Sequence, residues 1–140
     1  MSARAAANAA GEVWLLISDL VLDNMRRREV SDALGMSFGR ARALRRLARQ
    51  PMPMGELAAA LGIDPPNATV VVDELEAMGL ARRLAHPSDR RTKLVEATPK
   101  GKQLARRADA ILATPPPGMS ALSDDDLRTL RQILERVARH

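Results

Sequence analysis

The stretch HPSDRRTKLVEATPKG, residues 86–101, places an acid directly before two arginines, at Asp89, Arg90 and Arg91. Guanidinium groups on a short exposed loop cannot stabilise a core, but they donate hydrogen bonds readily to phosphate oxygens. The chemistry that this spacing offers is therefore the binding of a polyanion. The alternative is a charged turn that is simply solvated by water, which is the commoner role of an isolated Arg-Arg pair.

Residues for other kinds of chemistry are scarce. The chain contains no cysteine, which excludes disulfides, thiolate metal sites and thiol-oxidation switches. His86 and His140 are isolated, and no group of His, Asp and Glu has metal-ligand spacing. The run Asp124–Asp126 fits the first turn of a helix, where acids stabilise the helix dipole. With no Ser-His-Asp set and no glycine-rich phosphate loop, we expect no catalytic residue, no metal and no cofactor, and hence no enzyme.

The composition agrees with a basic binding protein. The 140 residues allow one domain, or one domain with a dimerisation extension. A net charge of +5, carried mainly by arginine, favours a polyanionic partner. Aromatic residues make up only 1% of the chain, which argues against the stacking surfaces that bind single-stranded nucleic acid.

Residues 54–80 carry two short helical patterns joined by a glycine. Gly62 suits the left-handed residue that follows a helix end. Asp64 can cap the next helix, with two prolines in its first turn, where missing N–H groups matter least. The pattern predicts a helix-turn-helix whose second helix spans residues 64–78.

A hairpin is expected directly after this helix-turn-helix. Residues 81–85 and 92–97 are short and mixed in polarity, and the loop between them contains a proline, so we predict two strands and an exposed tip. Thr98 followed by a proline then starts another helix. A hairpin that follows a recognition helix is the wing of a winged helix-turn-helix.

The ends of the chain contribute further helices. A helical pattern from Ala9 to Arg28 is apolar around much of its circumference, which suggests that a partner covers it. Ser37 is a plausible N-cap for a helix that runs to Gln50, and Ser123 for the last helix. We therefore predict a mainly α fold, a winged helix-turn-helix in the order α-α-α-α-β-β-α-α, with terminal helices that form a dimerisation domain.

No export signal or membrane span is expected. The longest uninterrupted apolar run near the start is Val13 to Ile17, far from the roughly 20 residues that cross a bilayer. We expect a soluble cytoplasmic protein without a membrane partner.

The chain resembles the multiple-antibiotic-resistance regulator (MarR) family of bacterial transcription factors. Three segments carry the resemblance: MGELAAALGI, VVVDELEAMGLARR and HPSDRRTKLVEATPKG. The last is the most specific, through its Asp-x-Arg at the wing tip and its Thr-x-x-Gly helix start. The resemblance implies a homodimer that reads a pseudo-palindromic operator in double-stranded DNA. It divides the chain into an N-terminal dimerisation helix in 1–36, a DNA-binding region in 37–98 with its wing at 81–97, and C-terminal dimerisation helices in 99–140.

The resemblance also assigns roles to individual residues. Asp89 and Arg91 match the wing-tip pair, of which the arginine enters the minor groove and Asp89 could orient its guanidinium. Asp73 matches a recognition-helix acid that can pair with that arginine, and Thr98 and Gly101 match positions that open the following helix.

A recognition helix presents its N-terminal residues to base edges in the major groove. Asn67 and Thr69 could contact bases or phosphates, and Val70 could touch a thymine methyl group. The candidates for phosphate neutralisation are Arg82, Arg83 and Lys93, which could equally face solvent. The arginines of the helix after Ser37 leave the same two alternatives open.

The function expected is that of a dimeric, sequence-specific DNA-binding regulator, a repressor relieved by a small aromatic or anionic effector. The alternative is a winged-helix module whose hairpin contacts another protein and not DNA.

The wing tip should contribute more to DNA affinity than any single side chain of the recognition helix. Val70 and Glu74 stand where relatives commonly carry basic residues, so this helix is short of positive charge. We expect Arg91→Ala to weaken DNA binding by about tenfold or more, and Asn67→Ala and Thr69→Ala to weaken it less. Fluorescence anisotropy at one fixed salt concentration measures all three, and a larger loss for either recognition-helix variant would contradict the expectation.

Overall fold

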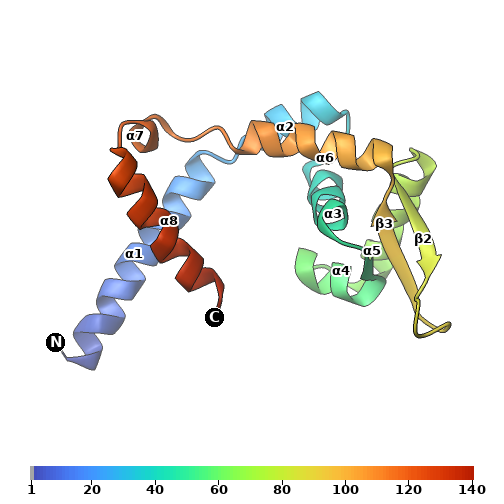
Figure 1. Ribbon diagram of the computed structural model, residues 1–140, viewed down its shortest axis with the longest axis horizontal. Helices are drawn as coiled ribbons and strands as arrows, with labels where there is room; N and C mark the ends of the chain where they lie inside the picture. The colour runs from blue at the N-terminus through green and yellow to red at the C-terminus, as the bar shows by residue number, and fades with distance from the viewer. Residues whose placement is uncertain (1) are drawn as a thin grey trace. The chain divides into compact units, whose positions relative to one another are not determined.

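The computed structural model describes residues 2–140, which fall into two compact units (Figure 1). The larger unit is Arg26–Ala113, and the smaller one combines the chain up to Met25 with the segment Thr114–His140. The larger unit extends beyond residues 36 and 99, where the functional divisions are predicted, because α2 (Arg27–Leu34) and α6 (Pro99–Leu112) pack into its core. The mainly helical, winged helix-turn-helix fold is confirmed.

Helices α3 (Phe38–Arg49), α4 (Met54–Leu61) and α5 (Pro65–Ala77) form the three-helix centre of the larger unit. The hydroxyl of Ser37 accepts a hydrogen bond from the N–H of Arg40 at 3.3 Å, so the predicted N-cap of α3 is confirmed. Gly62 ends α4 with φ +68°, a left-handed conformation that glycine adopts without a steric cost. Helix α5 then begins at the predicted Asp64 cap.

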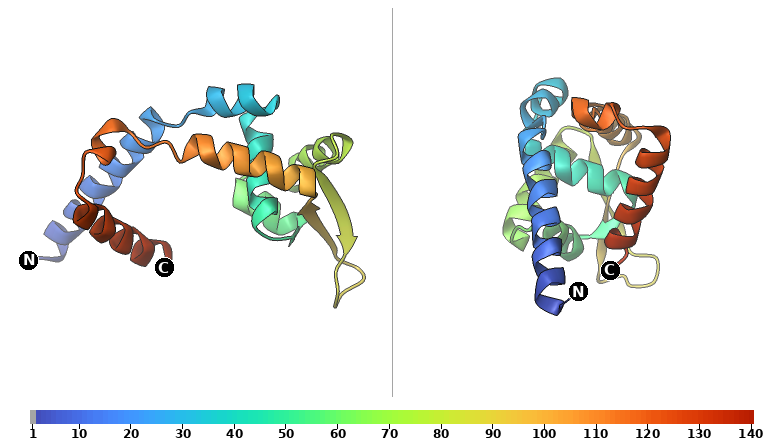
Figure 2. Two further views of the ribbon diagram at one scale, coloured as in Figure 1. Left: turned by 45° about the horizontal axis from the view of Figure 1, so that its top comes forward. Right: turned by 90° about the vertical axis from the view of Figure 1, so that its left-hand side faces the viewer.

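A three-stranded antiparallel sheet closes the larger unit, in the order β1-β3-β2. Strands β2 (Ala81–Ala85) and β3 (Lys93–Ala97) form the wing, with Arg83 opposite Val95. The left-hand view of Figure 2 shows the hairpin projecting beyond the helices of the larger unit. The sequence did not predict β1 (Met52–Pro53), which pairs Met52 with Val95, because two residues that include a proline show no alternation.

The core lies where α2, α3, α5 and the sheet meet. Its largest fully buried side chains are aliphatic: Leu44, Leu47, Leu57, Leu75, Leu80, Val30, Val72 and Val95. These positions recur at three-and-four spacing on the helices, so that each helix buries one stripe and exposes the other.

Helix α2 (Arg27–Leu34) was not predicted as a separate element. The sequence pattern suggested one helix from Ala9 to Arg28, but α1 (Ala3–Asp23) ends earlier and Arg26 between them has a positive φ of 26°. Helix α2 buries Val30 and Leu34 in the core of the larger unit. The pattern missed α2 because the break lies inside a charged run, Arg26–Glu29, which leaves only Val30, Ala33 and Leu34 as an apolar signal.

Thr98 and Gly101 hold the wing against helix α6 (Pro99–Leu112). The Thr98 hydroxyl donates to the carbonyl of Gly79 at 2.7 Å and accepts from the N–H of Gly101 at 3.1 Å. The N–H of Thr98 donates to the carbonyl of Leu80 at 3.0 Å. This cluster joins the end of α5, the end of β3 and the start of α6, as the predicted helix start at Thr98 requires.

The smaller unit contains α1, the single turn α7 (Pro117–Ser120) and α8 (Asp124–Ala138). None of the residues in these three helices is buried. Large apolar side chains lie open on α1, with Trp14 at 64% and Leu22 at 65% exposure, and on α8, with Val137 at 63%. The predicted cap of α8 is confirmed, because Ser123 accepts from the N–H of Asp126. Helix α7 was missed within the proline-rich segment.

The N-terminal stretch is more apolar than the sequence analysis expected. Within Ala3–Leu34, a window of mean hydropathy 1.4 is long and apolar enough to cross a membrane by length and composition alone, and none of it is buried. The difference arises because runs of alanine raise the mean hydropathy, whereas the sequence analysis considered only uninterrupted bulky residues. Three acids, Glu12, Asp19 and Asp23, lie within α1.

Substitution of Gly101 should destabilise the larger unit. A Cβ at this position would lie 2.1 Å from the carbonyl oxygen of Leu80 and 3.1 Å from a methyl group of Leu44. We expect Gly101→Ala to lower the free energy of unfolding by about 1–3 kcal/mol, the usual cost of overpacking. The matched control is Gly55→Ala in α4, where nothing lies within 4 Å of the added Cβ. Urea denaturation measures both, and an equal effect of the two substitutions would contradict the close packing at Gly101.

Candidate nucleic-acid interface

The N-terminal turn of α5 is held by its own side chains. The Asp64 carboxylate accepts hydrogen bonds from the N–H of Asn67 at 2.8 Å and from the Asn67 side-chain amide at 3.0 Å. The Thr69 hydroxyl donates to the carbonyl of Pro65 at 3.1 Å. Asn67 and Thr69 are both exposed, and the hydrogen bonds that their side chains donate stay within this first turn.

Three acids and no base lie on α5, and each acid meets an arginine from another element. Glu74 forms an ion pair with Arg40 of α3, and Glu76 forms one with Arg83 of β2. Asp73 also pairs with Arg83, at 2.8 Å. The expectation that Asp73 pairs with Arg91 is therefore corrected: β2 brings Arg83 beside α5, whereas Arg91 lies further out at the wing tip.

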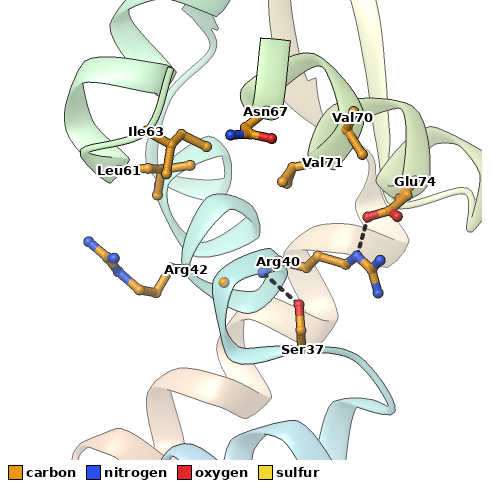
Figure 3. A pocket seen from close by; sticks show the side chains of 10 residues that line it. Ser37, Arg40, Arg42, Leu61, Ile63, Asn67, Val70, Val71 and Glu74 are labelled. Atoms are coloured by element: carbon orange, nitrogen blue, oxygen red, sulfur yellow. Dashed lines mark hydrogen bonds and ion pairs between the residues drawn. The ribbon is translucent and has the colours of Figure 1, made fainter. Parts of the chain in front are cut away.

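The hydrogen bond to Glu74 raises the pKa of Arg40 above its ordinary value, so the guanidinium remains charged. Figure 3 shows Arg40 reaching from α3 to Glu74 of α5 beside a shallow surface depression. Arg42, two residues further along the same helix, extends away from Glu74 (Figure 3). The residues that line the depression are Ser37, Gly39, Arg40, Arg42, Leu61, Ile63, Asn67, Val70, Val71 and Glu74.

Val70 is the most open large apolar side chain on the recognition helix, with 53% of its surface exposed. It lies on the outer wall of the depression, beside the half-buried Val71. An exposed β-branched residue contributes little to helix stability. Asn67, Thr69 and Val70 are all exposed near the N-terminus of α5, as the sequence predicted. The side chains of Asn67 and Thr69 each donate a hydrogen bond within the first turn.

Asp89 shapes the wing tip. One carboxylate oxygen accepts from the backbone N–H of Arg91 at 3.0 Å and the other from the Thr92 hydroxyl at 3.0 Å. The hydrogen bond from Arg91, and then that from Thr92, hold the pKa of Asp89 below its ordinary value. The suggestion that Asp89 orients the Arg91 guanidinium is corrected, because its carboxylate bonds the backbone and the hydroxyl and thereby fixes the turn.

The cations of the wing fall into two groups. Arg90, Arg91 and Lys93 are exposed and form no ion pair with any residue between 2 and 140. Arg82 and Arg83 pair with carboxylates, Arg82 with Glu96 across the hairpin. Of the residues proposed for phosphate neutralisation, Lys93 therefore has a free charge, whereas Arg82 and Arg83 share theirs with acids of the protein.

A row of arginines on α3 adds to the positive surface. Arg42, Arg46 and Arg49 are exposed and, within the described part of the chain, have no carboxylate partner. Arg45 of the same helix instead pairs with Asp109 of α6. Sequence analysis could not separate these roles, because all four residues sit in one basic run. Among residues 2–140, no three His, Cys, Asp or Glu side chains gather as a metal site would require.

The chain is similar in sequence to known transcriptional regulators. The sequence model of the MarR family matches residues 34–92. A putative transcriptional regulatory protein for the hcr operon of Thauera aromatica is 32% identical over 114 residues, which make up 80% of this chain and 69% of that protein.

Solved structures are similar over nearly the whole chain. The transcriptional regulator BldR from Sulfolobus solfataricus has a TM-score of 0.68 and 26% identity, covering 97% of this chain and 99% of its own. CouR from Rhodococcus jostii RHA1, solved with bound p-coumaroyl-CoA, has a TM-score of 0.64 and 27% identity, covering 94% and 93%.

The turn at Asp89 should respond to acid. Because folding lowers the pKa of Asp89, its carboxylate stabilises the turn above the unfolded value of about 3.9, and this stabilisation is lost as the pH falls through the lower, folded-state pKa. In an NMR titration, the Arg91 amide proton should shift with a midpoint below about 3.9. Asp89→Asn should abolish this shift. A midpoint above the ordinary value would contradict the two hydrogen bonds.

Proposed function

Because the chain belongs to the MarR family of transcriptional regulators, we propose that it acts as a homodimer that binds a pseudo-palindromic operator in double-stranded DNA. It is a regulator and not an enzyme. The proposal also covers its DNA contacts, its dimerisation, the sign of regulation and its effector. The observation that carries it is the wing tip, where two exposed arginines without a carboxylate partner follow a helix-turn-helix.

The wing contacts the minor groove in this proposal. Narrow minor grooves concentrate negative potential and attract an inserted arginine. Arg90 and Arg91 are free to respond to that potential, and Asp89 holds the turn that presents them. Lys93, the first residue of β3 after the wing tip, neutralises a phosphate. Arg82 and Arg83 contribute less, because their carboxylate partners offset their charge.

Helix α5 occupies the major groove with Asn67, Thr69 and Val70 toward the base edges. Its acids would repel the phosphates if they stood alone, but Arg40 and Arg83 pair with them from both sides. These two arginines thus reduce the electrostatic repulsion between the acidic helix α5 and the phosphates on either side of the major groove. The same pairs fix the angle of α5 against α3 and β2.

The homodimer is supported by the exposed terminal helices. An apolar surface of this kind, with Trp14, Leu16 and Leu22 each more than 60% exposed on α1, is not stable in water without a partner. Helix α8 adds a second open apolar row with Ile133, Leu134 and Val137. A second copy of the chain would cover both rows and would place two recognition helices on one DNA duplex.

A membrane is the other environment that α1 could enter by length and hydropathy. Glu12 and Asp19 within the helix would then face hydrocarbon at a substantial cost. The separate apolar row on α8, which lies on an amphipathic helix with a charged opposite face, favours a protein partner. We therefore propose that α1 takes part in the dimer and that the protein acts on DNA in the cytoplasm.

Regulation by a small molecule completes the proposal. CouR is seen with an aromatic acyl-CoA thioester, and its similarity to this chain suggests an aromatic acid or its thioester as the effector class. In this proposal the protein is a repressor, and the effector releases it from the operator. The same binding assay that detects the operator complex would detect this release.

The alternative is a winged-helix module that binds a protein through its hairpin. It would use the tip as a contact surface without neutralising phosphates, so its affinity would be insensitive to the release of DNA counterions. The three unpaired cations of the hairpin favour DNA, because a protein-binding tip has no comparable need for uncompensated charge.

The test is selection of bound sequences from a random pool of double-stranded DNA. We expect an inverted repeat with half-sites about one helical turn apart, as a symmetric dimer requires. Enrichment of no sequence would contradict the proposal.

The variant Leu16→Asp separates dimerisation from DNA contact. It places a charge among the exposed bulky apolar side chains of α1, and we expect a monomer by light scattering and at least about tenfold weaker binding of the selected site. The control Asn8→Asp adds the same charge to the alanine-rich start of α1, before the bulky apolar side chains begin at Val13. Trp14, the only tryptophan, reports on the interface through its fluorescence. A Leu16→Asp protein that remains dimeric would show that α1 is not the interface.

A further inference from the structure

The recognition helix lacks the groups that usually read guanine and adenine. Guanine is read most often by a bidentate Arg or Lys, and α5 contains neither. The Asn67 amide, which could read adenine, donates to Asp64. The acids that could accept from cytosine amino groups are engaged with Arg40 and Arg83. The Asn67 amide keeps its carbonyl oxygen and one N–H free, so direct readout through hydrogen bonds is restricted, and not removed, by these contacts.

What α5 leaves open is an apolar patch. Val70 has 53% of its surface exposed. Thr69 is exposed as well, and since its hydroxyl donates to the carbonyl of Pro65, its methyl group is the part that is free for a contact. The two residues are neighbours in the N-terminal half of the helix, the part that reaches base edges in the major groove. The only apolar group that a base pair shows there is the C5-methyl of thymine.

We propose that Val70, together with the methyl group of Thr69, recognises thymine through its C5-methyl group in the major groove. This inference rests on the proposed DNA binding. It divides the work between two elements: the wing supplies free charge and hence affinity, and α5 supplies sequence preference through methyl contacts. Arg40 and Arg83 serve the second role indirectly, because they neutralise the acids that flank the patch.

The depression beside α5 fits this division. Val70 and the half-buried Val71 form its α5 wall, and Leu61 and Ile63 contribute further apolar surface from the end of α4 (Figure 3). An exposed valine on a solvated helix face would be a poor choice for stability, since alanine forms helices better. A valine at position 70, on the face of α5 that enters the major groove in this proposal, is explained if a thymine methyl group covers its side chain.

The experiment replaces thymine by deoxyuridine, which removes the C5-methyl group and leaves all base-pair hydrogen bonds unchanged. In the site selected from the random pool, each thymine is replaced in turn, in one half-site at a time. We expect at least one replacement to weaken binding by the full-length protein about fourfold in each half-site, the value of burying one methyl group. Fluorescence anisotropy measures the ratio of the two dissociation constants.

Val70→Ala should reduce this thymine-to-uracil ratio to less than about twofold, because the contact with the methyl group is gone. Val70 is exposed and alanine favours a helix, so the variant should fold, which its thermal melting checks. The control Met78→Ala removes a different exposed apolar side chain at the C-terminal end of α5 and should retain the fourfold ratio.

Three outcomes are distinguishable. A wild-type protein that binds uracil and thymine sites equally overturns the inference while the proposed function stands. A ratio that persists in Val70→Ala also overturns it, since another residue then reads the methyl group. If no DNA site is selected at all, the proposed function itself fails.

Discussion

The three carboxylates of α5 constrain the whole surface through which DNA binding is proposed. A helix that carries Asp73, Glu74 and Glu76 and no base could not approach a phosphate backbone unless these charges were offset. Arg40 from α3 and Arg83 from β2 provide the opposite charges. These pairs tie α3, the recognition helix α5 and the wing into one arrangement.

The same constraint explains why the wing holds the free charge. Arg83, which could otherwise bind phosphate, is engaged with two acids of α5, and Arg82 pairs with Glu96. The cations left for DNA lie at and beside the tip, where Asp89 fixes the turn through the backbone N–H of Arg91. The tip therefore carries cations without a carboxylate partner, whereas the charges of α5 are paired and its exposed Val70 is apolar.

The local signals of the sequence were informative. Ser37, Asp64, Thr98 and Ser123 were each predicted as helix caps and each accepts the expected backbone hydrogen bond. Such caps depend on three or four consecutive residues and can be read without the fold. The helix-turn-helix and the wing followed from these boundaries.

The ion pairs could not be read in the same way. Arg40 and Glu74 are 34 residues apart, and Arg83 meets Asp73 only because β2 turns back beside α5. The family resemblance suggested Arg91 for Asp73, which the geometry corrects. Helix α2 was missed because its first residues, Arg27–Glu29, are charged and only Val30, Ala33 and Leu34 give an apolar signal. The compact unit Arg26–Ala113 extends beyond residues 36 and 99 because α2 and α6 pack in its core, which no local pattern shows.

The central claim is that free charge at the wing tip, and not on the recognition helix, binds the DNA backbone. The most direct test is the salt dependence of operator affinity for the wild-type protein and for the double variant Arg90→Ala/Arg91→Ala. The account predicts that the logarithm of affinity falls linearly with the logarithm of salt concentration, and that the slope becomes shallower by about 0.9 for each arginine that neutralises a phosphate. An unchanged slope in the double variant would contradict it.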